Sequence, residues 1–236
     1  INDLVLGRTE LPVPELPTEK NMRQIRAAEK LIRKKRRQYE NQNRQFSDMQ
    51  PDPLLTEYLD RMTFINKDGD TCEFTRLQKH DLNLVLQKRY ALLNWQQGSG
   101  KTAAVYHRAK YLLKFNKVRN VIILAPAIAT NMTWIPFLAM NRERFRVVRN
   151  NADLETVPEG VFLILSTSVL SKLKRGLSKF VRRTSGKLCL VFDESDEITN
   201  PSSQRTRHIL SIFRRLKYKI LDTGTTTRNN IAELYS

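Results

Sequence analysis

Five consecutive residues, Gly98-Ser99-Gly100-Lys101-Thr102, have the types and the spacing that bind nucleotide phosphates. They follow an apolar run and precede a helical pattern. Small residues let backbone N–H groups approach phosphate oxygens closely, and a helix N-terminus adds its positive dipole end. The ammonium of Lys101 can reach the β- and γ-phosphates, and the Thr102 hydroxyl can ligate Mg²⁺. A plain Gly/Ser turn is the alternative for this segment taken alone.

A second group of candidate residues, Asp193 and Glu194, directly follows an apolar run at 188–192. Nucleotide hydrolases place a Mg²⁺-holding aspartate and a water-orienting residue at strand ends of this kind. Taken alone, the pair would be an ordinary solvated strand end. Together with the glycine-rich loop, and in this order, it predicts a hydrolytic site in which Lys101, Asp193 and Glu194 are the catalytic residues.

The elements that must position these residues alternate regularly along the chain. Apolar runs predict strands at 90–94, 121–125, 161–165, 188–192 and 218–221, and helical patterns separate them at 77–88, 101–115, 131–140, 168–182 and 203–216. Strand–helix alternation predicts an α/β fold with a parallel sheet and helices on both faces. Ligands of such sheets bind beyond the carboxyl ends of the strands. The loop, Asp193 and the segment Thr223-Gly224-Thr225 all follow expected strands, so we expect them to meet.

The N-terminal part of the chain has a different character. Three prolines within residues 1–18 predict an extended linker. Residues 19–47 predict one amphipathic helix, whose apolar positions are Met22, Ile25, Ala28 and Ile32. Residues 20–37 hold nine basic residues and one acid, a balance of +8. Such a helix contacts phosphates, packs on the main domain, or is simply solvated. A short helix at 54–62 and a turn at 66–70 follow it.

The charge composition indicates what kind of partner the chain binds. The chain carries 41 Lys and Arg against 24 Asp and Glu, a net charge of +17 at pH 7. This surplus indicates a polyanionic partner, nucleic acid first, with a solvated basic surface as the alternative. The segment 172–187 alone holds seven basic residues and no acid, and the same two interpretations apply to it.

The sequence disfavours disulfide-bonded, membrane-inserted and secreted proteins. Two cysteines, Cys72 and Cys189, argue against a disulfide framework and predict a reducing, intracellular compartment. No apolar run approaches the roughly 18 residues that span a bilayer, and no secretory pattern is present, so we expect neither membrane insertion nor secretion. Because the chain begins with Ile1, we expect a piece of a longer protein.

In this order, the motifs resemble the first RecA-like lobe of superfamily 2 helicases and translocases, most closely the Snf2-like group. The resemblance covers residues 72–236, preceded by a basic helical extension over 1–71. Gly98 to Thr102 match motif I, and Asp193-Glu194-Ser195-Asp196 match motif II. Gln78 resembles the family glutamine that recognises adenine ahead of motif I.

Three further segments resemble motifs that bind nucleic acid or couple the nucleotide site to lobe movement. The stretch 122–126 with the residues after it resembles motif Ia, and 165–167 resembles motif Ib. The resemblance implies nucleic-acid contacts for Asn131, Trp134, Ser166 and Thr167. The stretch 223–225, with 229–230 and 233–234 after it, resembles motif III. Coupling of the γ-phosphate to lobe movement would involve Asp196, Thr223, Gly224 and Thr225.

The resemblance implies an ATP-dependent DNA translocase or helicase with ATP and Mg²⁺ as cofactors and double-stranded DNA as the expected partner. Mg²⁺ would be held by Thr102 directly and by Asp193 through water, and Glu194 would activate the attacking water. The second lobe, with its arginine finger, is absent from this chain. We therefore expect the chain to bind nucleotide and to hydrolyse it weakly or not at all.

Alternatives stay open at this point. A motor subunit of a restriction or recombination system, an RNA helicase, and a nucleotide-dependent nucleic-acid clamp all fit the motifs. An unrelated P-loop kinase or GTPase is disfavoured by Gln78, by the motif III match and by the charge. Three positions depart from the Snf2-like pattern: Trp95 before the loop, Asp196 where histidine is usual, and Thr226 where proline is usual.

Overall fold

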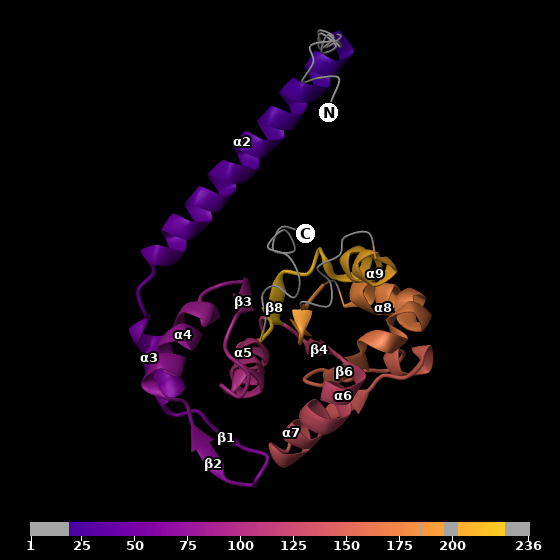
Figure 1. Cartoon of the computed structure of the whole chain (residues 1–236). Coiled ribbons are helices and arrows are strands. Elements are labelled where there is room, and N and C mark those ends of the chain that lie inside the picture. The colour runs from indigo at the N-terminus through magenta and orange to yellow at the C-terminus, as the bar shows by residue number, and fades with distance from the viewer. Residues whose placement is uncertain (1–18, 185, 196–202, 225–236) are drawn as a thin grey trace, which may run out of the picture. The chain divides into compact units, whose positions relative to one another are not determined.

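The structure is a computed structural model of residues 1–236, in which residues 19–184, 186–195 and 203–224 are described. The chain divides into two compact units, Ile1–Gln50 and Pro51–Ser236 (Figure 1). The first unit contains helix α2 (Glu19–Ser47), a single helix of 29 residues whose side chains from 21 to 37 are exposed. The predicted helix over 19–47 is thereby confirmed, whereas the predicted linker at 1–18 lies outside the described residues.

The second unit is built on a parallel sheet of six strands in the order β3-β8-β7-β4-β6-β5. Its strands are β3 (Tyr90–Leu93), β4 (Asn120–Ala125), β5 (Phe145–Val147), β6 (Phe162–Ser166), β7 (Leu188–Phe192) and β8 (Tyr218–Asp222). The predicted α/β class and the five predicted strands are confirmed. Strand β5 escaped prediction because it has three residues, lies at the sheet edge and carries Arg146 at its centre, so that it forms no apolar run.

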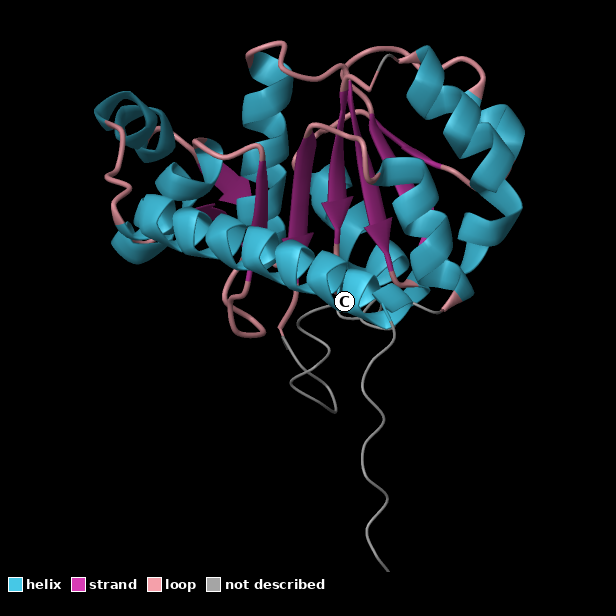
Figure 2. Cartoon of the chain, turned by 90° about the horizontal axis from the view of Figure 1, so that it is seen from above, coloured by secondary structure: helices cyan, strands magenta, loops and turns pink. Residues whose placement is uncertain are grey.

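Helices cover both faces of this sheet (Figure 2). They are α4 (Arg76–Leu86), α5 (Lys101–Lys114), α6 (Ala127–Ala129), the π-helical turn η1 (Thr130–Trp134), α7 (Ile135–Met140), α8 (Leu170–Arg183) and α9 (Gln204–Phe213). Two short 3₁₀ turns, η2 (Asn151–Leu154) and η3 (Thr167–Val169), complete them.

Alternate residues of the strands supply two separate cores, as the two-residue period of a strand requires. Val121 and Ile123 of β4 pack with α4, α5 and α7, whereas Ile122 and Leu124 pack with α8 and α9. The central strands are buried at every position, which explains their continuous apolar runs.

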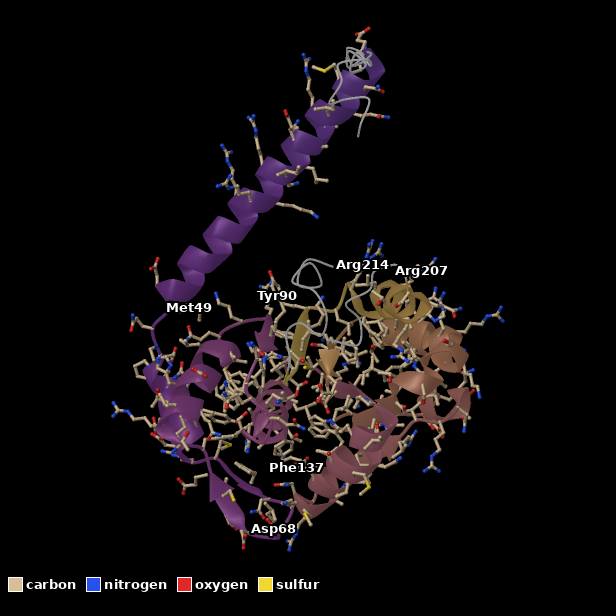
Figure 3. All side chains as sticks on the ribbon, in the orientation of Figure 1. Met49, Asp68, Tyr90, Phe137, Arg207 and Arg214 are labelled. Atoms are coloured by element: carbon tan, nitrogen blue, oxygen red, sulfur yellow. The ribbon has the colours of Figure 1, made fainter. Side chains whose placement is uncertain are left out.

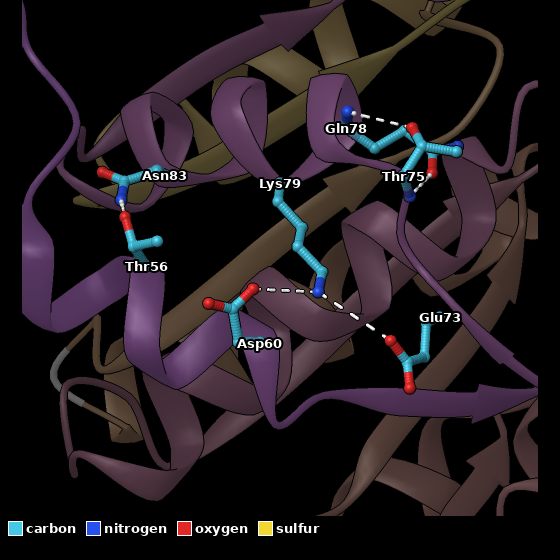
Figure 4. Close-up of polar contacts among 7 residues, drawn as sticks. All are labelled: Thr56, Asp60, Glu73, Thr75, Gln78, Lys79 and Asn83. Carbon is cyan, nitrogen blue, oxygen red and sulfur yellow. Dashed lines mark hydrogen bonds and ion pairs between the residues drawn. The ribbon is translucent and has the colours of Figure 1, made fainter.

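Helix α3 (Pro53–Asp60) and the hairpin of β1 (Thr63–Ile65) and β2 (Thr71–Glu73) belong to the second unit. The side chain of Asn83, on α4, bonds the backbone N–H and carbonyl of Asp52 at 2.8 Å each and the hydroxyl of Thr56 at 2.9 Å. Lys79 bridges Asp60 and Glu73 (Figure 4). The second compact unit therefore begins at Pro51, whereas the resemblance to a helicase lobe begins at residue 72.

Candidate nucleotide-binding site

The glycine-rich loop connects the end of β3 to the start of α5. Gly98 and Gly100 adopt φ of 79° and 82°, in the left-handed region that favours glycine. Gly100 is the N-cap of α5 and supplies no side-chain cap, so the first N–H groups of this helix have no side-chain acceptor at the cap position. A helix start of this kind is an anion site, since those N–H groups and the dipole both favour negative charge.

The ammonium of Lys101 lies within the loop. It donates to the carbonyls of Trp95 at 3.0 Å and Gln96 at 3.2 Å. A Cβ built on Gly224 would lie 3.4 Å from this nitrogen, so the segment after β8 closely approaches the loop lysine. The structure thus brings together motif I and the described part of motif III, as the strand-end argument predicts.

Trp95, which departs from the usual loop sequence, anchors the loop entry. Its indole N–H donates to a carboxylate oxygen of Asp81 on α4 at 3.0 Å, and its ring packs against the core. The bulky residue therefore ties the loop entry to α4, and its carbonyl is one of the two acceptors of the Lys101 ammonium.

Gln78 links α4 to the loop. Its side-chain carbonyl accepts from the N–H of Thr75 at 2.7 Å, while the Thr75 hydroxyl accepts from the Gln78 N–H, which makes a capping box (Figure 4). Its side-chain amide donates to the carbonyl of Ser99 at 2.9 Å. Sequence reasoning missed this role, although the spacing Thr-x-x-Gln before an apolar run is the signal for it. Adenine recognition by Gln78 stays a prediction.

Asp193 continues the hydrogen-bond ladder beyond the end of β7, since its N–H donates to Leu124 at 2.9 Å. Thr223 does the same beyond β8 toward Leu93. Because β8 lies between β3 and β7, the segment after β8 lies between the glycine-rich loop and the motif II acids.

Glu194 has φ of 53°, a left-handed conformation that costs a non-glycine residue roughly 1–2 kcal/mol. Such strain is characteristic of functional sites.

Trp134 requires a correction. Its side chain is fully buried, and its indole N–H donates to a carboxylate oxygen of Asp193 at 2.7 Å. A buried indole offers no face to nucleic acid, so in this structure Trp134 orients Asp193. Thr167 is also buried, Ser166 is half-buried, and Asn131 is exposed.

Asp222, which the sequence did not single out, is a buried carboxylate at the end of β8. Its side chain is 1% exposed, and its Oδ1 has no hydrogen-bond partner. Burial raises the pKa of Asp222 well above its ordinary value, and the charges of Asp193 and Glu194 raise it further, while Lys101 lowers it. Two carboxylates and one ammonium of the site therefore lie within electrostatic reach of the buried Asp222.

The oxygen ligands at the carboxyl edge of the sheet suit Mg²⁺ as nucleotide-binding sites hold it. Mg²⁺ binds through one or two carboxylates together with substrate phosphates, rather than in an all-protein cage. Thr102 and Asp193 supply a hydroxyl and a carboxylate, and no cluster of three or more acidic, histidine or cysteine ligands occurs within the described residues. The predicted coupling residues Asp196 and Thr225 lie outside the described residues.

No protein-family model matches the chain. A curated relative, the ATP-dependent helicase fft3 of Schizosaccharomyces pombe, is 27% identical over 165 residues, which are 63% of this chain and 17% of the relative. The matched part is thus a small share of that protein's length.

Two solved structures have a similar fold. A SWI2/SNF2 ATPase core from Sulfolobus solfataricus, in complex with double-stranded DNA, matches 70% of this chain and 34% of its own with a TM-score of 0.55 and 18% identity. The UvsW helicase of bacteriophage T4 matches 77% of this chain and 63% of its own, with a TM-score of 0.54 and 15% identity. The chain therefore has the RecA-like fold of these ATPase and helicase structures, and the expected resemblance to Snf2-like helicases is confirmed as a similarity to the SWI2/SNF2 core and to fft3.

Proposed function

We propose that this chain is the ATP-binding lobe of a Snf2-like DNA translocase or helicase, which couples ATP hydrolysis to movement on nucleic acid. The observation that supports this most is the meeting of three chain segments at one sheet edge. Lys101, Asp193 and Gly224 follow three different strands. A Cβ built on Gly224 would lie 3.4 Å from the Lys101 ammonium, and the charges of Lys101 and Asp193 both act on Asp222 at the end of β8.

In this proposal the protein acts mainly by positioning and by charge. The backbone N–H groups from Gly98 to Lys101 hold the phosphates, and the Lys101 ammonium leaves the carbonyls of Trp95 and Gln96 to approach them. Mg²⁺, when bound through Thr102 and Asp193, neutralises phosphate charge. Glu194 orients the attacking water and accepts its proton, while Trp134 fixes the orientation of Asp193, as outer-shell partners of metal ligands do.

Double-stranded DNA is the partner we propose, since the similar Sulfolobus core was solved in complex with it. The loops after β4 and β6 would contact the sugar-phosphate backbone through Asn131 and Ser166, and such contacts position a protein without reading sequence. Strand separation, as the name of the bacteriophage helicase indicates for that protein, is the second candidate. Hydrolysis at a full rate requires a second lobe with an arginine finger.

The test uses the full-length protein with Glu194→Gln. We expect nucleotide binding to persist and DNA-stimulated hydrolysis to fall by a factor of about 10³ or more, because the water loses its general base. A Glu143→Gln variant, which changes a carboxylate distant from the loop, serves as the control. Normal hydrolysis by Glu194→Gln would refute the assignment of the base.

A further inference from the structure

Helices α8 and α9 lie side by side over the second face of the sheet, and a groove of about 710 Å³ runs between their C-terminal halves. We call it the α8–α9 groove. Its walls include Val181, Arg182, Leu210, Ile212, Arg214 and Arg215. Figure 3 shows Arg207 and Arg214 on the α9 side of the second unit.

The groove is strongly basic, and none of its described lining residues is acidic. Residues 170–184 and 203–217 contain no Asp or Glu. Arg182, Arg214 and Arg215 are exposed, and none of the three forms an ion pair with an acidic side chain among the described residues. Within the described part of the chain, the side-chain hydrogen bond of these arginines runs from Arg182 Nε to the carbonyl of Ser178 at 3.3 Å. Guanidinium groups of this kind bind carboxylates with two parallel hydrogen bonds.

Favourable interaction with helix dipoles explains part of this arrangement, because basic residues stabilise helix C-termini. It does not explain the apolar wall beside them. Leu210 is 47% exposed, whereas the preceding residue, Ile209, is buried. An exposed leucine framed by arginines suits an occupant that carries both acidic and apolar side chains.

The place of the groove in the fold favours a peptide over nucleic acid. The C-termini of α8 and α9 lead into the starts of β7 and β8, so the groove lies toward the amino edge of the sheet. Lys101, Asp193 and Thr223 lie at the carboxyl edge, as do the loops after β4 and β6. A sugar-phosphate backbone would also leave the apolar wall unused.

We propose that the α8–α9 groove binds an acidic amphipathic segment of a partner protein. Carboxylates of the segment pair with Arg182, Arg214 and Arg215, and an apolar side chain packs on Leu210. Helical peptides recognised in grooves present anchors at positions i, i+3 or i+4, and i+7, which matches a groove between two helices. This inference does not depend on nucleotide hydrolysis.

The test measures binding of a labelled helical peptide of Glu and Leu, with Leu at i, i+4 and i+7, to the whole chain by fluorescence anisotropy at constant salt. We expect R214Q/R215Q to weaken binding about tenfold and L210S to weaken it several-fold, as interface anchors do. The control K172Q/K174Q removes the same charge from exposed positions of α8 outside the groove. Its affinity for the peptide should differ from that of the parent chain by less than about twofold. Thermal unfolding of each variant verifies that it is folded.

Three results would overturn the proposal. Equal weakening by R214Q/R215Q and K172Q/K174Q would mean that the peptide senses only net charge. A DNA duplex that displaces the peptide, and itself binds about tenfold more weakly to R214Q/R215Q, would assign the groove to nucleic acid. A peptide with Gln in place of Glu should bind weakly, and equal binding would also contradict the pairing of carboxylates with arginines.

Discussion

At the scale of single residues, the hydrogen bond between Trp134 and Asp193 is the contact that bears most directly on the proposed Mg²⁺ site. The indole donates to one carboxylate oxygen of Asp193 at 2.7 Å, which restricts the rotation of this carboxylate. The bond joins a residue of η1 to the end of β7, two elements that are far apart in the sequence. Its loss should therefore affect Mg²⁺ binding more than it affects folding.

Trp134→Phe keeps most of the buried ring volume and removes the donor. We expect the Mg²⁺ concentration needed for half-maximal nucleotide binding to rise about tenfold, as for other outer-shell partners. A titration of Mg²⁺ at fixed nucleotide measures it. Tyr106→Phe, which removes the hydroxyl that donates to Glu143, is the control and should leave the Mg²⁺ dependence unchanged. An unchanged dependence in Trp134→Phe would show that the indole does not act on the metal site.

His107 makes the stability of the fold depend on pH. Its ring packs against Phe74 and Tyr106, and neither ring nitrogen has a hydrogen-bond partner. Burial lowers the pKa of His107 to about 4, from 6.5 in an unfolded chain, with a smaller contribution from Lys110. Between these values the unfolded state binds a proton that the folded state does not. Stability should therefore rise with pH across this window and level off above it.

On this basis, acidification from pH 7 to pH 5 should remove about 2 kcal/mol of stability through His107. Asp222, whose pKa is raised, acts in the opposite direction, so the effect is isolated as the difference between the parent and His107→Phe. Urea unfolding of both chains at the two pH values measures it. If the difference in unfolding free energy between the parent chain and His107→Phe is the same at pH 5 and pH 7, the attribution of the pH dependence to His107 is wrong.

At the scale of elements, Asn83 joins α3 to α4. Its buried side chain makes four hydrogen bonds, two of them to the backbone of Asp52, the N-cap of α3. Removing it leaves those backbone groups without their partner. We expect Asn83→Ala to lower the free energy of unfolding by about 2 kcal/mol.

Thr56→Ala is the comparison for that prediction. It removes the exposed partner of the same amide, so its cost should be about 0.5–1 kcal/mol. Chemical denaturation of both variants gives the values. Equal costs for the two variants would mean that the Asn83 bonds to Asp52 add no stability.

The elements that the sequence predicted are those with a regular burial pattern. The central strands are buried on both faces and appear as apolar runs, and α8 and α9 bury one stripe each. Strand β5 and the β1–β2 hairpin have only three residues per strand, too few for a pattern to emerge. The chemistry of the loop followed from residue types, whereas the positions of Trp134 and Asp222 depend on tertiary packing that no spacing shows.

At the scale of the whole molecule, the chain consists of a basic helical unit and an α/β unit. The second unit has two hydrophobic cores that involve residues from Leu59 to Ile220. Its core therefore does not require the first fifty residues. Within the described residues, no helix combines the length and the apolar character needed to cross a bilayer.

This division predicts that residues 51–236 fold without the preceding unit. The midpoint of thermal unfolding of the shortened chain should lie within about 2 °C of that of the whole chain, since a shift of 1 kcal/mol would move it by about 2–4 °C. Circular dichroism of the two chains at equal concentration measures it. A loss of cooperative unfolding in the shortened chain would show that the first unit supports the core.

The central claim is that the loop around Lys101 binds the phosphates of ATP together with Mg²⁺. Isothermal calorimetry of Mg²⁺-ATP binding to the chain, beside Lys101→Ala, tests it most directly. We predict one site in the parent chain and binding at least about tenfold weaker in the variant, because the ammonium contributes charge-assisted bonds to the phosphates. Absence of binding to the parent chain, or equal binding to both, would contradict the claim.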